Sequence, residues 1–162
     1  MKFYKKIFAS KYDSFMKGIE TSFHSIRAEL IKELEGEILD VGSGTGVNFV
    51  HFNSNANVIA VEPSAFMMAK AKEKLPVKAN ITTYNFGVTD DEMNAIIPKK
   101  SLDYIVCTLV LCTIPDQQLA LNNFKKWLKP TGKLIILEHI HAEKKPNRFL
   151  QNVVNPLWKV VG

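Results

Sequence analysis

Cysteine is scarce in this sequence: its 162 residues contain two, Cys107 and Cys112, inside or beside one apolar run. Two cysteines alone build neither a disulfide framework nor a four-ligand zinc site, so no metal site is expected. No apolar run approaches the ~20 residues of a membrane-spanning helix. The first residues are basic but lack a long apolar segment and a cleavage site, so no secretory signal is expected. A cytoplasmic protein is therefore the expectation.

A strong excess of one charge is also missing. Lysine and arginine number 21 against 16 acidic residues, which leaves a net charge of +5. This is below the density of a dedicated nucleic-acid-binding protein, so no nucleic-acid partner is expected. Apolar residues make up 46% and charged residues 23% of the chain. These values are typical of soluble globular proteins and argue against disorder, collagen and coiled coils.

Short β-branched segments alternate with helical segments along most of the chain. Strands are predicted over 37–41, 57–61, 80–84, 102–110 and 133–137, and helices over 64–75 and 116–128. Ser64 and Asp116 are suitable N-cap residues, and Pro130 and Gly132 are expected to end the second helix. Alternation of this kind predicts an α/β fold, a doubly wound parallel sheet with helices on both faces.

The most informative stretch is a glycine-rich turn after the first predicted strand, Asp40-Val-Gly-Ser-Gly-Thr-Gly46. Glycines allow a tight turn and let the backbone approach a ligand closely. A dinucleotide fingerprint, G-x-G-x-x-G, needs its third glycine at Val47, so the G-x-G-x-G spacing here weakens that interpretation. Glu62 ends the next strand, about twenty residues further on, where a carboxylate can accept both hydroxyls of a ribose.

With these motifs the sequence resembles the class I S-adenosylmethionine-dependent methyltransferases. Leu102-Asp103 and Leu128-Lys-Pro-Thr-Gly-Lys133 add to the resemblance. A narrower similarity, to the phospholipid N-methyltransferases and thiol methyltransferase-like proteins, is carried by 106–114, 137–139 and 151–158. The ubiquinone/menaquinone methyltransferases are more distant. The resemblance implies a Rossmann-like sheet with strands 3-2-1-4-5 present and C-terminal strands 6 and 7 missing.

The resemblance also implies the organisation of the chain as a single domain, 1–162. It comprises N-terminal helices or a lid (1–35), a cofactor-binding core (36–140) and the start of a truncated C-terminal substrate region (141–162). The implied cofactor is S-adenosyl-L-methionine, and the implied acceptor is a small molecule or a lipid. The residues expected to hold the cofactor are Asp40, Gly42, Ser43, Gly44, Thr45, Gly46, Asn48, Glu62, Pro63, Met67, Gly87, Val88, Thr108 and Leu109.

Two further residues are candidates for the chemistry. His139, at the end of the fifth strand, could orient or deprotonate a nucleophile. Tyr12 could lie over the cofactor and favour the sulfonium by a cation–π contact. An ordinary structural role stays open for both residues.

The segment 1–19 combines an apolar stripe with a lysine-rich flank. It is interpreted either as a helix packed on its own domain or as a lid that makes weak contact with a membrane surface. Two alternatives to a methyltransferase also stay open: a non-catalytic cofactor-binding or regulatory domain, and an NAD(P)-dependent oxidoreductase. Nucleic-acid methylation is disfavoured, because Cys112-Thr-Ile-Pro-Asp116 stands where an Asp/Asn-Pro-Pro-Tyr/Phe stretch would follow the fourth strand.

Overall fold

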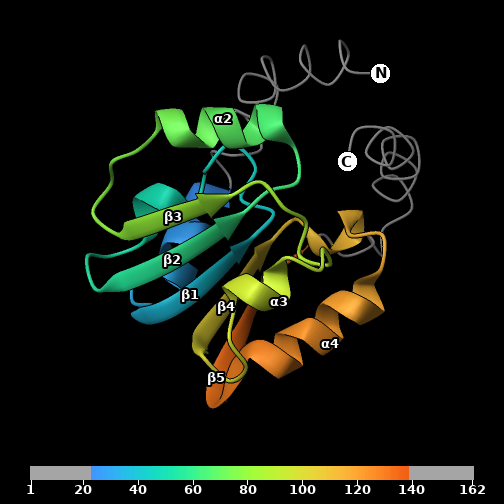
Figure 1. Ribbon diagram of the computed structural model, residues 1–162. Helices are drawn as coiled ribbons and strands as arrows, with labels where there is room; N and C mark the ends of the chain where they lie inside the picture. Colours follow the sequence, from blue (N-terminus) through green and yellow to red (C-terminus); the bar gives the residue numbers. More distant parts are fainter. Residues whose placement is uncertain (1–22, 139–162) are drawn as a thin grey trace, which may run out of the picture.

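A computed structural model describes residues 23–138 of the chain. Five parallel strands form one sheet in the order β3-β2-β1-β4-β5, as the sequence predicts (Figure 1). The elements are β1 (Gly36–Val41), η1 (Phe49–His51), β2 (Ala56–Val61), α2 (Ala65–Glu73), β3 (Asn80–Tyr84), α3 (Met93–Ile96), β4 (Leu102–Thr108), η2 (Leu111–Thr113), α4 (Gln117–Trp127) and β5 (Leu128–Leu137). Residues 23–31 are helical as well. Tyr12, His139 and the segments 1–19 and 141–162 lie outside the described residues, as would strands 6 and 7.

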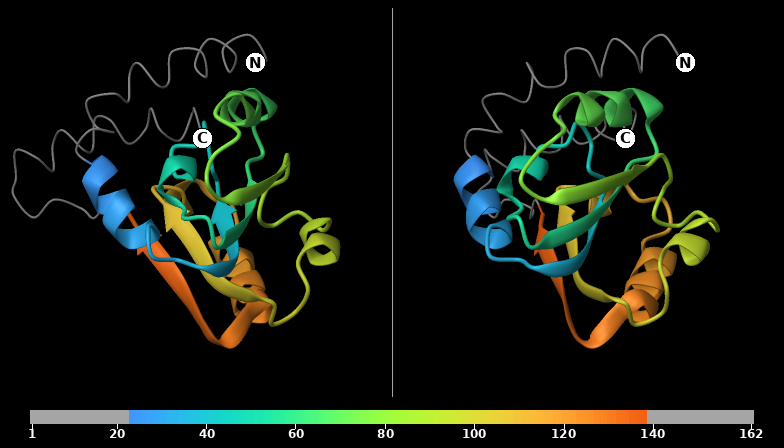
Figure 2. Two further views of the ribbon diagram at one scale, coloured as in Figure 1. Left: turned by 90° about the vertical axis from the view of Figure 1, so that its left-hand side faces the viewer. Right: turned by 60° about the vertical axis from the view of Figure 1, so that its left-hand side comes forward.

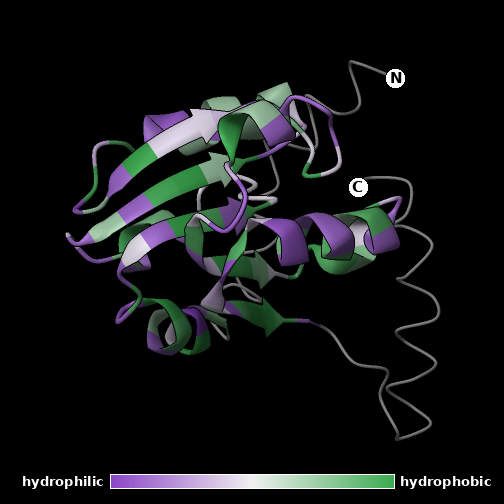
Figure 3. Ribbon diagram, turned by 60° about the horizontal axis from the view of Figure 1, so that its bottom comes forward, coloured by the Kyte–Doolittle hydropathy of each residue, from purple (hydrophilic) through white to green (hydrophobic). Residues whose placement is uncertain are grey.

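Helices cover both faces of the sheet, so the fold is doubly wound (Figure 2). One face packs against α3 and α4 through a core that includes Leu39, Ile105, Phe124 and Trp127. The opposite face packs against the helix 23–31 and α2, in two smaller clusters that include Ile31, Ile38, Phe52, Phe49 and Met68. Hydrophobic residues follow the central strands, as burial on both faces requires (Figure 3).

The predicted N-caps begin α2 and α4. The side chain of Ser64 accepts a hydrogen bond from the Met67 amide, and that of Asp116 accepts one from the Leu119 amide at 2.8 Å. These bonds satisfy amides that have no partner within the helix. The helices therefore begin one residue after the predicted caps.

Two predicted strand ends are wrong by two residues or more, whereas β1 and β2 each begin one residue earlier than predicted. β5 begins at Leu128, five residues before the prediction, because the chain becomes extended directly after α4 and pairs with β4 through an irregular register. At Gly132 the two strands approach so closely that a Cβ atom would lie 2.8 Å from the Leu102 carbonyl oxygen. β4 ends at Thr108 and not at residue 110, because Leu109 takes a left-handed backbone conformation with φ +58°.

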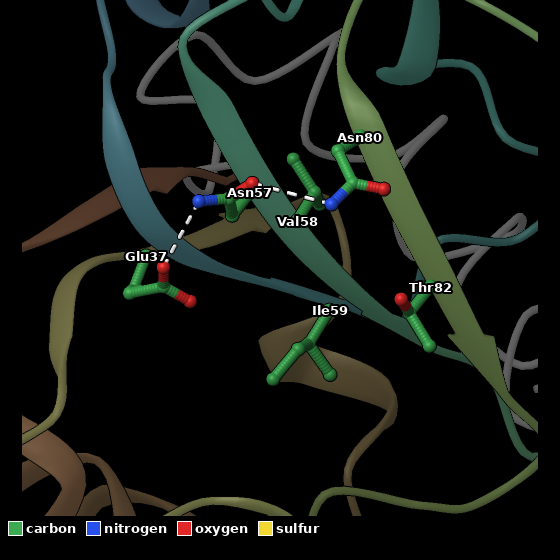
Figure 4. A pocket seen from close by; sticks show the side chains of 6 residues that line it. All are labelled: Glu37, Asn57, Val58, Ile59, Asn80 and Thr82. Carbon is green, nitrogen blue, oxygen red and sulfur yellow. Dashed lines mark hydrogen bonds between the residues drawn. The ribbon is translucent and has the colours of Figure 1, made fainter.

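Polar side chains join the strands at their amino ends. Asn57 donates to Glu37 at 3.0 Å, and Asn80 donates to Asn57 at 3.3 Å, across three neighbouring strands (Figure 4). These residues line a cavity of about 330 Å³, together with Val58, Ile59 and Thr82. In parallel α/β sheets ligands bind at the carboxyl ends of the strands. Because Glu37, Asn57 and Asn80 lie at the starts of β1, β2 and β3, this cavity is at the opposite end of the sheet from the glycine-rich turn.

Asp103 joins the amino ends of β1, β4 and β5. It accepts from the Glu37 amide at 3.0 Å and from the Lys129 ammonium at 2.7 Å. The hydrogen bond from Lys129 holds the pKa of Asp103 below its ordinary value. Among residues 23–138, no helix is long and apolar enough to cross a membrane.

Candidate cofactor and acceptor site

The glycine-rich turn leaves β1 at the carboxyl end of the sheet. Gly42, Gly44 and Gly46 all have positive φ values, at +60°, +55° and +75°, which favour glycine. The turn is fixed by backbone bonds: the Ser43 amide donates to the Val61 carbonyl at 3.0 Å, and the Gly46 amide donates to the Ser43 carbonyl at 2.8 Å. The sequence therefore forms a compact loop whose centre is Gly44.

The three glycines have different surroundings. A Cβ atom at Gly42 would collide with the Val110 side chain, and one at Gly46 would lie 2.8 Å from the Phe49 ring. A Cβ atom at Gly44 would have one neighbour within 4 Å, the Gly42 carbonyl oxygen at 3.9 Å. Gly42 and Gly46 thus allow the loop to pack, whereas Gly44 leaves open space above the backbone.

Glu62 connects the end of β2 to this loop. Its Oε2 accepts from the Gly44 amide at 3.1 Å, and its Oε1 accepts from the Ser64 amide at 2.8 Å. Burial raises the pKa of Glu62, and the two amide hydrogen bonds oppose that effect. Each carboxylate oxygen keeps a second lone pair with which it can accept a further hydrogen bond.

Asp40 is the fully buried acid beneath the loop. Its Oδ1 accepts from the Asn48 side-chain amide at 2.7 Å, and the same amide donates to the Thr108 hydroxyl at 3.1 Å. Its Oδ2 is buried and has no hydrogen-bond partner among the described residues. Burial raises the pKa of Asp40 to about 7, while the Asn48 hydrogen bond and the positive charge of Arg27 act in the opposite direction.

Sequence reasoning missed Arg27, which lies on the helix 23–31 and is only 3% exposed. The positive charge of Arg27 lowers the pKa of Asp40, so a buried positive charge lies near this acid beneath the loop. The sequence analysis expected Asn48 and Thr108 at the cofactor, but it did not predict that Asn48 bonds to both Asp40 of β1 and Thr108 of β4. The interactions of Asp40 with Arg27 and Asn48, and of Asn48 with Thr108, join residues at least eight positions apart, so local sequence patterns do not reveal them.

A second loop, after β3, carries Gly87 and Val88. The Gly87 amide donates to the Asp90 carboxylate at 2.7 Å, and Asn123 of α4 donates to the Val88 carbonyl at 3.3 Å. Asn85, two residues before Gly87, donates to the Glu62 backbone carbonyl at 2.7 Å. The loop is therefore held by α4 on one side and by the end of β2 on the other.

Four other expected residues lie at the start of α2 or in the glycine loop. Pro63 is exposed and Met67 is half-buried, so both can present apolar surface beside Glu62. The hydroxyl of Thr45 accepts from Lys74 at 3.4 Å. The buried hydroxyl of Ser43 has no partner among the described residues.

The segment after β4 lies against the glycine loop, because Val110 occupies the space that a side chain at Gly42 would need. Glu138, at the end of β5, accepts from the Val110 and Leu111 amides at 2.8 and 2.7 Å. Sequence reasoning concentrated on the neighbouring His139 and gave Glu138 no role. All fourteen residues expected at the cofactor lie within the described part of the chain, at the carboxyl ends of β1 and β4 or on the segments that follow β1, β2, β3 and β4.

Comparison with known proteins identifies the family. Residues 12–158 match the family described as "Methyltransferase domain". The chain is 30% identical over 138 residues to thiol S-methyltransferase TMT1B of Rattus norvegicus, covering 82% of this chain and 57% of the relative. It is 30% identical over 125 residues to thiol S-methyltransferase TMT1A of Homo sapiens, covering 76% and 51%. The chain thus spans just over half the length of these relatives.

Solved structures share the fold. A methyltransferase of Aquifex aeolicus, described as S-adenosylmethionine-dependent, aligns with a TM-score of 0.63 at 17% identity, covering 88% of this chain and 86% of that one. A complex of DhpI with S-adenosylmethionine aligns with a TM-score of 0.68 at 21% identity, covering 92% and 68%. The match over 12–158 and the strand order lead to one assignment: the chain belongs to the methyltransferase domain family, among the class I S-adenosylmethionine-dependent methyltransferases.

Proposed function

We propose that this chain binds S-adenosylmethionine and catalyses transfer of its methyl group to a small-molecule thiol. The observation that carries the proposal is the open space above Gly44, whose amide is bonded to the buried carboxylate of Glu62, with the buried carboxylate of Asp40 at the end of β1 beneath the same loop. Family membership supports the reaction type. The names of the two relatives, both thiol S-methyltransferases, support the acceptor.

The residues present fit this cofactor. S-adenosylmethionine carries an ammonium, a sulfonium and two ribose hydroxyls, so its site needs anionic acceptors and backbone that a ligand can approach. Glu62 has lone pairs left to accept from both ribose hydroxyls. The Oδ2 of Asp40 is a buried acceptor without a partner among the described residues, and it suits the ammonium, directly or through a water molecule.

The other expected residues complete the cofactor side. In this proposal the backbone from Gly42 to Gly46, with Ser43 and Thr45, follows the amino-acid part and the ribose. Pro63 and Met67 cover one face of the adenine by apolar contact. The backbone of Gly87 and Val88 borders the adenine edge, and Asn48 holds Asp40 in place. Thr108 and Leu109 lie at the carboxyl end of β4, where ligands of open α/β sheets bind, and border the reacting methyl group.

The bound cofactor supplies a methyl group on an already activated sulfonium. The chain therefore has to hold the acceptor in line with this group and to exclude water, and orientation alone can supply ~7–11 kcal/mol of the barrier. A thiol has an ordinary pKa of about 8.5, so part of it is thiolate at neutral pH without a catalytic base. The roles predicted for His139 and Tyr12 stay predictions.

A lipid acceptor is the second candidate that the sequence raised, together with contact between residues 1–19 and a membrane surface. It depends on residues outside the described part of the chain, as does the function of 1–19 as a lid. A cytoplasmic location likewise stays a prediction. We favour the thiol because both named relatives are thiol S-methyltransferases, and the segment bordering the proposed methyl position, Leu109 to Leu111, is apolar.

The test has a binding arm and a turnover arm. S-adenosylhomocysteine should raise the melting temperature of the chain, whereas NAD and NADP should not; a ligand at a hundred times its Kd stabilises by about 2.7 kcal/mol. The chain with S-adenosylmethionine and 2-mercaptoethanol should form S-adenosylhomocysteine and the methyl thioether. Stabilisation by NAD alone would overturn the cofactor assignment. Binding with turnover of phosphatidylethanolamine but not of thiols would overturn the thiol assignment.

A further inference from the structure

The segment Leu109 to Thr113, which we call the post-β4 turn, has an unusual backbone. Leu109 is left-handed with φ +58°, and Val110 follows with φ −127° and ψ −31°. In a turn of this kind, successive amides can point into a small concave site that suits an anion. The Leu109 amide itself donates to the Leu137 carbonyl at 2.7 Å, which leaves the next two amides for another acceptor.

That acceptor is the Glu138 carboxylate. A single oxygen, Oε1, accepts from the Val110 amide at 2.8 Å and from the Leu111 amide at 2.7 Å. The exposed Cys112 thiol lies near Glu138, since burial and then this carboxylate raise the pKa of the thiol. One carboxylate that follows β5 therefore holds two consecutive residues of the post-β4 turn.

The post-β4 turn in turn supports the glycine loop. Val110 lies against Gly42, so that even a methyl group at Gly42 would collide with it. At the other end of the turn, Gln117 donates to the Leu111 carbonyl at 2.9 Å, which ties the turn to the start of α4. A displacement of the post-β4 turn would therefore change both the glycine loop and the position of Leu109 to Leu111, which border the proposed methyl position.

We propose that Glu138 is a positioning residue for methyl transfer, because its carboxylate holds the post-β4 turn against Gly42 in the geometry that an acceptor needs. The role rests on the proposed function, since it concerns the acceptor side of that site. Glu138 does not act as a base in this proposal, because its Oε1 is occupied by two backbone amides. It contributes to turnover through the placement of Val110 and Leu111.

Two variants separate position from charge. Glu138→Gln keeps a side-chain oxygen that accepts from both amides, whereas Glu138→Ala removes it. With S-adenosylmethionine and 2-mercaptoethanol, we expect Glu138→Ala to lower kcat about tenfold, a loss of ~1.4 kcal/mol of transition-state stabilisation. The KM for S-adenosylmethionine should change less than kcat. Glu138→Gln should restore most of kcat, and the exposed Glu33→Ala serves as the matched control.

A second readout needs no catalysis. The chain has two cysteines, and Cys107 is fully buried, so alkylation by iodoacetamide reports on Cys112. Burial and the nearby Glu138 raise the pKa of Cys112, so both variants should shift the pH midpoint of alkylation downward. At high pH, where the thiol is ionised in every form, the plateau rate reports access. We expect only Glu138→Ala to raise that plateau.

The outcomes are distinct. A wild-type plateau and a wild-type kcat in Glu138→Ala would overturn the positioning role. An equal loss of kcat in Glu138→Gln and Glu138→Ala would overturn it as well, since charge and not position would then matter. A chain that methylates no acceptor would overturn the proposed function instead, and the alkylation plateau would then decide alone whether Glu138 holds the turn.

Discussion

Gly44 and Gly46 both have positive φ values but different neighbours, and this difference gives a sharp test of the glycine loop. Gly44→Ala places a methyl group in open space, so its cost to stability is limited to the left-handed backbone, about 1–2 kcal/mol. The same methyl group would occupy the space proposed for the cofactor. We expect Gly44→Ala to bind S-adenosylhomocysteine at least about tenfold more weakly in calorimetric titration, a loss of ~1.4 kcal/mol.

Gly46→Ala is the matched comparison. Its methyl group would meet the Phe49 ring at 2.8 Å and the Ala71 Cα at 3.2 Å, so overpacking adds about 1–3 kcal/mol to the backbone cost. We expect Gly46→Ala to lower the free energy of unfolding by more than Gly44→Ala does. Wild-type affinity in a folded Gly44→Ala variant would place the cofactor elsewhere.

Asp40 predicts an unusual dependence of stability on pH. Its pKa rises from 3.8 to about 7 on folding, chiefly because the carboxyl group is buried. Between these two values the folded chain keeps a proton that the unfolded chain releases, so the free energy of unfolding falls as pH rises. Asp40→Asn removes this contribution. Relative to wild type, the variant should gain a few kcal/mol between about pH 4 and pH 7, since one pKa unit corresponds to about 1.4 kcal/mol.

Urea unfolding at several pH values measures this effect, with the exposed Asp91→Asn as the control. The Asn48 hydrogen bond to Oδ1 can persist in Asp40→Asn, which keeps the comparison clean. The same variant should bind S-adenosylmethionine more weakly, because a neutral amide replaces the proposed acceptor of its ammonium. Parallel stability profiles for wild type and variant would show that Asp40 titrates normally.

The residues that sequence analysis placed in the site are those whose spacing along the chain carries the information. Asp40, the glycines and Glu62 lie at strand ends, and parallel strands bring such ends together. Arg27 and Glu138 could not be found in this way. A buried arginine on a helix and a glutamate before a histidine look ordinary in sequence, and their roles depend on how distant segments approach. The left-handed Leu109, which directs two amides toward Glu138, has no marker in the sequence either.

At the level of elements, α4 offers a direct test of N-capping. Asp116 accepts from the Leu119 amide at 2.8 Å, and the helix that it begins places Phe124 and Trp127 in the core. Asp116→Ala should lower the free energy of unfolding by about 1 kcal/mol, because an amide at the helix start loses its acceptor. Thermal and urea unfolding can measure the change. Asp116→Ser keeps a capping oxygen and should lose much less; equal losses would attribute the effect to something other than the cap.

Helix starts and strand identities were predictable because N-caps and β-branched runs are local signals. The boundary between α4 and β5 was not, for a physical reason. Pro130 and Gly132 indicated an interruption, and the helix does end before them, but the chain pairs with β4 at once. The ion pair between Lys129 and Asp103 and the close backbone approach at Gly132 favour this pairing. The first depends on a residue of β4 that lies 26 positions earlier, and the second on Leu102 of the same strand.

The whole sheet presents two edges of different character. Among the described residues, β3 lies at one edge, short and polar, with Asn80 and Thr82 exposed, and β5 lies at the other. β5 is ten residues long, and its Ile136 side chain is 47% exposed. Natural proteins commonly protect edge strands with short length, charge or proline, because an apolar edge can pair with a second chain.

The self-association of the protein should therefore depend on the β5 edge more than on the β3 edge. The first part of β5 carries Lys129, Pro130 and Lys133, so the unprotected apolar part is Leu134–Leu137. Ile136→Lys places a charge there, and we expect it to raise the protein concentration at which light scattering first detects self-association. Thr82→Lys adds the same charge at the polar edge and should leave that threshold unchanged. An equal gain from both variants would attribute the effect to net charge. A gain from Ile136→Lys alone would mean that the solubility of the chain in storage and expression depends on β5, and that one substitution far from the glycine loop can improve it.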